Sequence, residues 1–81
     1  MSTIETTVRQ VLADHARLGT DAQNLASDAD LYAAGMTSHA SVNVMLACED
    51  ELDVEFPESM LNRETFSSID AITRAVESLQ D

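Results

Sequence analysis

Ser38 is the side chain best placed to carry chemistry in this chain. It ends the segment Gly35-Met36-Thr37-Ser38, where a polar loop gives way to a helical pattern. The hydroxyl therefore lies at the start of a helix, where free N–H groups and about half a unit of positive charge favour phosphate. The chain is otherwise poor in catalytic residues. The pattern indicates a serine displayed for modification rather than a catalytic nucleophile.

His39 directly follows Ser38 and raises the question of a nucleophile with its general base. Adjacent residues of a helix do not face each other. A catalytic pair also needs an orienting acid and an oxyanion site, and the sequence offers neither. We expect no catalytic residues. Two interpretations of His39 stay open, a partly exposed surface histidine and a contact to a partner or to the group on Ser38.

The composition limits the classes of partner. The 81 residues make one domain, residues 1–81, with fifteen acids, four bases and a formal net charge of -11. All four bases are arginines, so Schiff-base chemistry at a lysine is excluded. Acidity of this degree excludes nucleic acid and anionic membranes as expected partners and favours proteins with basic surfaces. We expect a monomer.

The single cysteine, Cys48, excludes an internal disulfide and any multi-cysteine metal site. Its spacing predicts an inert, buried thiol. Neither a signal peptide nor a membrane-spanning segment is evident, so we expect a reducing, cytoplasmic location. Residues 49–58 hold six acids and no base. They lack the pattern of a calcium loop, so we expect no metal site and interpret them as steering the chain toward basic partners.

Helical spacing and capping residues predict the first half of the chain. Ser2 and Glu5 form a capping box for a first helix, and Gly19 suits its end. Its apolar face is expected at Ile4, Val8, Val11 and Leu12, with His15 near the end. Residues 20–36 form a long loop. We expect Leu25 and Leu31 to pin that loop to the core.

The second helix is expected from Ser38 to Leu52, with Thr37 as its N-cap. A core face is predicted at Val44, Met45, Cys48 and Leu52. A second apolar stripe begins one residue after Ser38, and acids stand at its edge. We call this set the partner stripe; it comprises His39, Val42 and Leu46, with Asn43, Glu49 and Asp50 at the edge.

Pro57 ends this region, and Ser59 to Glu64 form a short helical turn. Ser67 and Asp70 predict a second capping box. The last helix carries its apolar face at Ile69, Ile72, Val76 and Leu79. Three clear helices, one short one and a long first loop are therefore expected.

The order of elements and two local segments resemble the acyl carrier protein family over nearly the whole chain. The first segment is Asp28-Ala29-Asp30-Leu31-Tyr32-Ala33-Ala34-Gly35-Met36, and the second is Glu49-Asp50-Glu51-Leu52-Asp53-Val54-Glu55-Phe56-Pro57. The resemblance implies an all-α, antiparallel four-helix bundle with a long first loop and a short third helix. It also implies a 4′-phosphopantetheine arm on Ser38 that holds cargo as a thioester, and a phosphopantetheinyl transferase as a partner.

A narrower resemblance is to small bacterial carrier proteins that hold amino acids. It rests on residues 32–38, Phe56-Pro57, Leu61-Asn62-Arg63 and Phe66-Ser67-Ser68-Ile69. Those carriers are loaded by stand-alone ligases similar to the catalytic half of seryl-tRNA synthetases. The resemblance implies an aminoacyl cargo and such a ligase as a partner, with the carrier itself non-catalytic.

Two residues depart from the wider family pattern, which usually has aspartate before the serine and leucine after it. This chain has Thr37 and His39 there, and we include both in the expected partner surface. Two alternatives stay open. One is a carrier of fatty-acyl, polyketide or lipid-A chains, sheltered among Met36, Met45 and Met60. The other is an unmodified acidic adaptor that binds a protein through the second helix.

Overall fold

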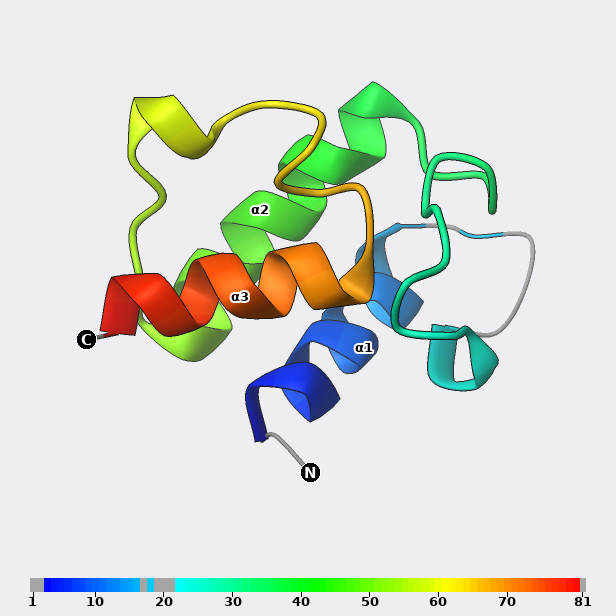
Figure 1. Ribbon diagram of the computed structural model, residues 1–81, viewed down its shortest axis with the longest axis horizontal. Coiled ribbons are helices and arrows are strands. Elements are labelled where there is room, and N and C mark those ends of the chain that lie inside the picture. The colour runs from blue at the N-terminus through cyan, green and yellow to red at the C-terminus, as the bar shows by residue number, and fades with distance from the viewer. Residues whose placement is uncertain (1–2, 17, 19–21, 81) are drawn as a thin grey trace.

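Apolar residues at helical spacing build three α-helices. The computed structural model describes residues 3–16, 18 and 22–80, and no strand occurs in that part of the chain. The helices are α1 (Thr3–His15), α2 (Ser38–Leu52) and α3 (Ile69–Gln80), and two single turns of 3₁₀ helix, η1 (Ala22–Asn24) and η2 (Glu58–Met60), lie between them (Figure 1). The all-α prediction is confirmed.

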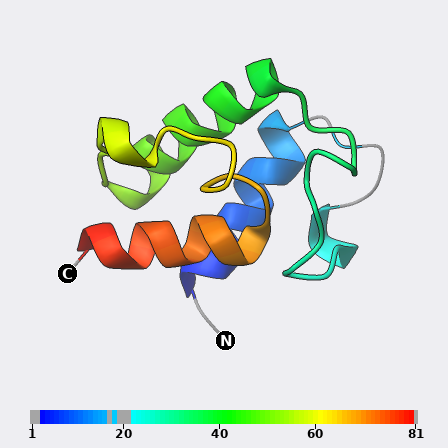
Figure 2. The ribbon, with the colours of Figure 1, turned by 45° about the horizontal axis from the view of Figure 1, so that its top comes forward.

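One hydrophobic core joins the helices. Helix α1 packs against both α2 and α3, and Figure 2 shows it crossing from α3 toward the start of α2. The fully buried side chains of this core include Val8, Leu12, Leu31, Val44, Cys48, Ile69, Ile72 and Val76. Full burial of one such aliphatic side chain contributes about 1.5–3 kcal/mol. The core faces predicted for the first and last helices are therefore confirmed, with Ile4 and Leu79 only partly buried at their edges.

Arg9 fixes the long first loop to α1, a structural role that was not predicted from the sequence. The Arg9 guanidinium pairs with Glu5 at 3.1 Å and donates to the carbonyl oxygens of Ala22 and Leu25 at 3.0 and 2.7 Å. Leu25 packs against the core as expected but is only half-buried, and the neighbouring Ala22 in η1 is buried in the core. The predicted capping residues Ser2 and Gly19 lie outside the described residues.

The second half of the loop is fixed to the segment before α3. Leu31 is fully buried, as predicted, and its N–H donates to the Ser67 carbonyl at 2.8 Å. Asp70 N–H donates to the Ser27 carbonyl at 2.9 Å. These two bonds hold residues 27–31 beside residues 67–70, although the two segments are far apart in the sequence.

The short helical turn expected at 59–64 is the 3₁₀ turn η2 at Glu58–Met60. The Asn62 side-chain oxygen then accepts hydrogen bonds from the N–H and the hydroxyl of Thr65, both at 3.0 Å. Because asparagine side chains offer the backbone an alternative to helical bonding, the chain turns here and does not continue as a helix. The described residues accordingly hold three α-helices and not four.

Helix α3 is capped by Ser68, so the prediction of a cap at Ser67 is wrong. Ser68 Oγ accepts from Ala71 N–H at 3.0 Å, and the Ser67 hydroxyl donates backward to the Glu64 carbonyl at 2.8 Å. Either serine could cap the helix by residue type. Ser68 does so because the Ser67 hydroxyl is already bonded to the Glu64 carbonyl in the turn at residues 64–67.

Thr73 places a hydroxyl group in this core. Its side chain is buried, and its hydroxyl has no hydrogen-bond partner among the described residues. An unpartnered buried hydroxyl costs about 1–3 kcal/mol. We expect Thr73→Val, which keeps the shape and removes the hydroxyl, to raise the free energy of unfolding by about 1 kcal/mol in urea denaturation. Thr65→Val, at a hydroxyl that is bonded, is the control and should destabilise. A loss of stability in Thr73→Val would show that the hydroxyl is satisfied in solution.

Candidate functional site

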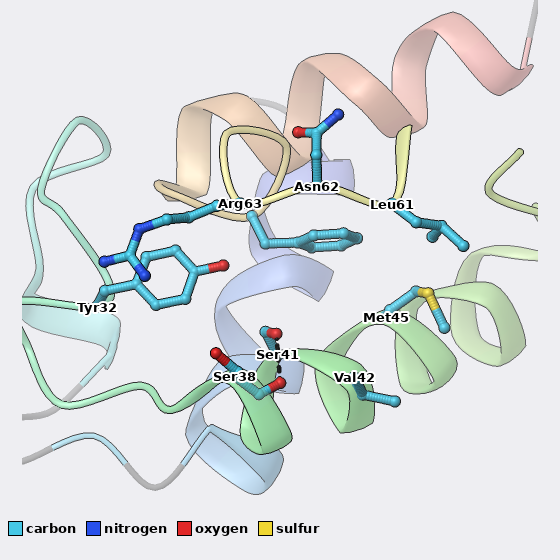
Figure 3. A pocket seen from close by; sticks show the side chains of 9 residues that line it. Tyr32, Ser38, Ser41, Val42, Met45, Leu61, Asn62 and Arg63 are labelled. Carbon is cyan, nitrogen blue, oxygen red and sulfur yellow. Dashed lines mark hydrogen bonds between the residues drawn. The ribbon is translucent and has the colours of Figure 1, made fainter. Parts of the chain in front are cut away.

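The start of α2 displays Ser38 as the sequence predicts. Thr37 is extended, with φ −86° and ψ 166°, and its Oγ1 accepts from Ala40 N–H at 3.0 Å. Ser38 is consequently the first helical residue, and its side chain is exposed. The hydroxyl has no hydrogen bond within the described residues, whereas the Ser38 carbonyl accepts from the Ser41 hydroxyl at 2.7 Å (Figure 3). The Ser38 hydroxyl is therefore open to modification.

A groove of about 450 Å³ begins at Ser38 and runs between α2 and residues 61–66 (Figure 3). Val42 and Met45 line it from α2, and Leu61 and Phe66 line it from the opposite segment. The Phe66 ring also makes an edge-on contact with the buried Phe56 ring, at 5.4 Å between centroids. The groove is thus a largely apolar channel with the serine at one end.

Arg63 and Tyr32 close the serine end of the groove. The Arg63 guanidinium lies over the Tyr32 ring, 3.9 Å from its centroid (Figure 3). Local turns position both side chains. Asp30 accepts from Tyr32 N–H at 2.9 Å, and Asn62 holds the turn that carries Arg63. Neither Arg63 nor Tyr32 was predicted as a site residue, although Tyr32 lies in both of the family-like stretches near Ser38 and Arg63 lies in the narrower resemblance.

The partner stripe is exposed along α2. Val42 and Leu46 are 50% and 52% exposed, and Leu61 across the groove is 48% exposed. His39, Asn43 and Asp50 are also exposed. The stripe therefore extends across the groove to Leu61, which sequence periodicity along α2 could not reveal.

Glu49 differs from the rest of the stripe because it is engaged within the fold. Its carboxylate accepts from Phe56 N–H at 2.9 Å, and its carbonyl accepts from the N–H of Asp53, the left-handed residue that ends α2. This arrangement anchors the segment that leads to Phe56. Glu49 thus stabilises the end of α2, in addition to standing at the edge of the stripe.

His39 does not share the groove with Ser38. It lines a separate hollow of about 370 Å³ beside the end of α1, together with His15, Thr37 and Asn43. The absence of a nucleophile–base pair at Ser38 and His39 stays a prediction, and so does a contact of His39 with a partner.

Cys48 faces the core and not the site. The thiol is fully buried, and burial, with a smaller effect of the neighbouring Glu49 carboxylate, raises its pKa to about 12. It is therefore a poor nucleophile at neutral pH. Across the described ranges, no group of three or more His, Cys, Asp or Glu side chains could hold a metal ion. None of the helices in those ranges has the length and apolarity needed to cross a membrane.

The acids at residues 49–58 have no basic partner in the described part of the chain. The two ion pairs found there join Arg9 to Glu5 and Arg74 to Asp70, both outside this stretch. Uncompensated like charges oppose compaction, and salt screens them over about 10 Å at 0.1 M. We expect the melting temperature to rise with sodium chloride, and magnesium at matched ionic strength to raise it further by bridging carboxylates. A melting temperature that stays flat or falls would show that the fold already compensates these charges.

Comparison with known proteins finds a family model that covers this site and a relative that matches most of the chain. A family model described as a phosphopantetheine attachment site matches residues 6–76, which include Ser38. The chain is 47% identical over 75 residues to an aminoacyl carrier protein of Agrobacterium fabrum strain C58, covering 93% of this chain and 90% of the relative.

Solved structures give the same relationship. One similar chain comes from an engineered Bradyrhizobium japonicum glycine:carrier protein ligase complexed with a carrier protein from Agrobacterium tumefaciens and ATP. Its TM-score is 0.89 at 45% identity, over 93% of this chain and 97% of that one. Another comes from the Bradyrhizobium japonicum ligase complexed with glycylated carrier protein, with a TM-score of 0.78 at 27% identity, over 91% and 99%. The chain with the exposed serine at the start of α2 therefore belongs to the family of carrier proteins with a phosphopantetheine attachment site.

Proposed function

We propose that Ser38 carries 4′-phosphopantetheine and that the chain holds an aminoacyl group as a thioester on the thiol of that arm. The observation that carries this proposal is the exposed Ser38 hydroxyl, unengaged at the first position of α2. In the modification, the Ser38 oxygen attacks the phosphorus of coenzyme A that bears pantetheine. An O–P bond forms as the hydroxyl proton passes to a base of the transferase, the pyrophosphate bond breaks, and adenosine 3′,5′-bisphosphate leaves.

The residues around Ser38 suit a phosphodiester. The first N–H groups of a helix have no partner within the helix, and the helix dipole there favours an anion by about 0.3–1 kcal/mol at an exposed site. Thr37 occupies only the Ala40 N–H with its hydroxyl. The start of α2 can therefore hold the phosphate of the arm, whose thiol supplies the thioester chemistry when it is attached.

A stand-alone amino acid:carrier protein ligase, similar to aminoacyl-tRNA synthetases, is the proposed loading partner. The relatives found in complex with a glycine:carrier protein ligase support this assignment. We assign the contact surface to residues at the start and along the exposed side of α2, namely Thr37, His39, Val42, Asn43, Leu46, Glu49 and Asp50. The acids of residues 49–58 would then attract a basic surface on the ligase.

The remaining features fit a small carrier. Residues 1–81 act as one domain and one monomer, without catalytic activity, in the cytoplasm, where a lone cysteine stays reduced. The 3₁₀ turn η2 with residues 61–66 takes the place that a short third helix has in a four-helix carrier bundle. Support for this last point comes from its place in the fold, where these residues form one wall of the groove that begins at Ser38.

Intact mass spectrometry tests the proposal in two steps. Incubation with coenzyme A and a broad-specificity transferase should add one phosphopantetheine. Addition of ATP, an amino acid and the loading ligase should then add one aminoacyl group that hydroxylamine removes. Absence of the first gain would favour an unmodified adaptor. A carrier that refuses amino acids and is stabilised by a long acyl chain would instead belong with fatty-acyl carriers.

A further inference from the structure

We propose that Arg63, stacked on Tyr32, binds the phosphodiester of the arm on Ser38 and directs the arm into the groove between α2 and residues 61–66. The inference rests on the proposed attachment at Ser38 and adds a binding site for the arm within this chain.

The first support is the charge distribution. The chain has only four positively charged side chains against fifteen acids. Arg9 is paired with Glu5 and fixed to the loop carbonyls, and Arg74 is paired with Asp70. Arg63 has no carboxylate within ion-pair distance in the described part of the chain, although acids outnumber bases there. A cation left without a carboxylate in so acidic a protein is available for another anion.

The second support is the geometry of the pair. Arg63 and Ser38 line the same groove, and the Tyr32 ring lies between the guanidinium and the loop that leads to α2 (Figure 3). The guanidinium carbon lies 3.9 Å from the ring centroid, a cation–π contact across the face of the ring. The N–H groups of a guanidinium lie in one plane around that carbon, in a fork that can bind phosphate oxygens in pairs. The Tyr32 ring thus holds Arg63 in place at little further cost in entropy when the phosphate is bound.

The third support is the lining beyond the arginine. The groove continues from Ser38 past Val42 and Met45 on one side and Leu61 on the other. These apolar walls suit the dimethyl and methylene groups of pantetheine. The positive charge of Arg63 disfavours the ammonium group of an aminoacyl thioester at the serine end. The phosphate is therefore held at Arg63 while the charged cargo stays at the far end, within reach of an enzyme.

The test compares the apo and modified forms of each variant, so that effects on the unmodified fold cancel. We expect modification of the native chain to raise the melting temperature. It should also shift the backbone amide resonances of residues 61–66 and the side-chain resonances of Arg63 in the NMR spectrum. In Arg63→Gln, at least half of the gain in melting temperature and most of the shifts in 61–66 should disappear, and the ³¹P resonance should move toward that of a free phosphodiester. Tyr32→Leu should act in the same direction.

Arg74→Gln is the matched control, since it removes the same charge from an exposed arginine on α3. It should keep the native response to modification. An equal response in native chain, Arg63→Gln and Arg74→Gln would overturn the phosphate contact while leaving attachment at Ser38 intact. Absence of any gain of mass in the native chain would overturn both proposals.

Discussion

Replacing Ser38 with alanine is expected to abolish the gain of phosphopantetheine mass while leaving the fold intact. The Ser38 side chain is exposed, and its hydroxyl makes no hydrogen bond within the described residues. The cap of α2 comes from Thr37, which the substitution does not touch. Alanine is the best helix former, so we expect stability to change by no more than about 0.5 kcal/mol. Circular dichroism and intact mass after incubation with coenzyme A and the transferase give the two readouts.

Ser41→Ala provides the matched control. Ser41 lies on the next turn of α2 and lines the same groove, and its hydroxyl is bonded to the Ser38 carbonyl. The Ser41→Ala variant should be modified like the native chain. Modification of Ser38→Ala, or peptide mapping that places the group on another serine of the native chain, would contradict the assignment.

Helix α2 was the most predictable element because its N-cap and the apolar spacing of its two faces can be read within the helix itself. The N-cap at Thr37 and the start at Ser38 are confirmed, and so is the end at Leu52. Val44 and Cys48 are fully buried as predicted, while Met45 and Leu52 are only partly buried. Met45 departs because it lines the groove, a surface that one helix does not define.

The wall of the groove was not predictable from periodicity. Arg63 and Tyr32 meet because Leu31 N–H is bonded to the Ser67 carbonyl, a contact between two loops. Such contacts depend on the positions of both loops and leave no repeating pattern in either. The same limit explains Ser68, since the choice between two adjacent serines was made by a turn that engages Ser67.

Leu46→Arg is expected to slow aminoacyl loading at least tenfold without loss of helicity. Leu46 is 52% exposed on the side of α2 that also carries Val42, so the longer side chain can extend into solvent in the free protein. In the complex with the ligase, the same arginine would have to be buried against an apolar contact or placed against a basic surface. Loss of one of the few contacts that dominate an interface costs about 2 kcal/mol or more, about thirtyfold in affinity. The loading rate at limiting carrier concentration measures this loss.

Ala13→Arg separates a surface effect from a charge effect, because Ala13 is exposed on α1 and the substitution adds the same charge. It should load at nearly the native rate. Asp50→Arg should lower mainly the association rate and its dependence on salt, since Asp50 is exposed and acts by attraction. Glu49 is unsuitable for this comparison because its carboxylate also holds Phe56 N–H. Native loading by Leu46→Arg would show that Leu46 lies outside the contact with the ligase. Unfolding of that variant would show that Leu46 belongs to the fold.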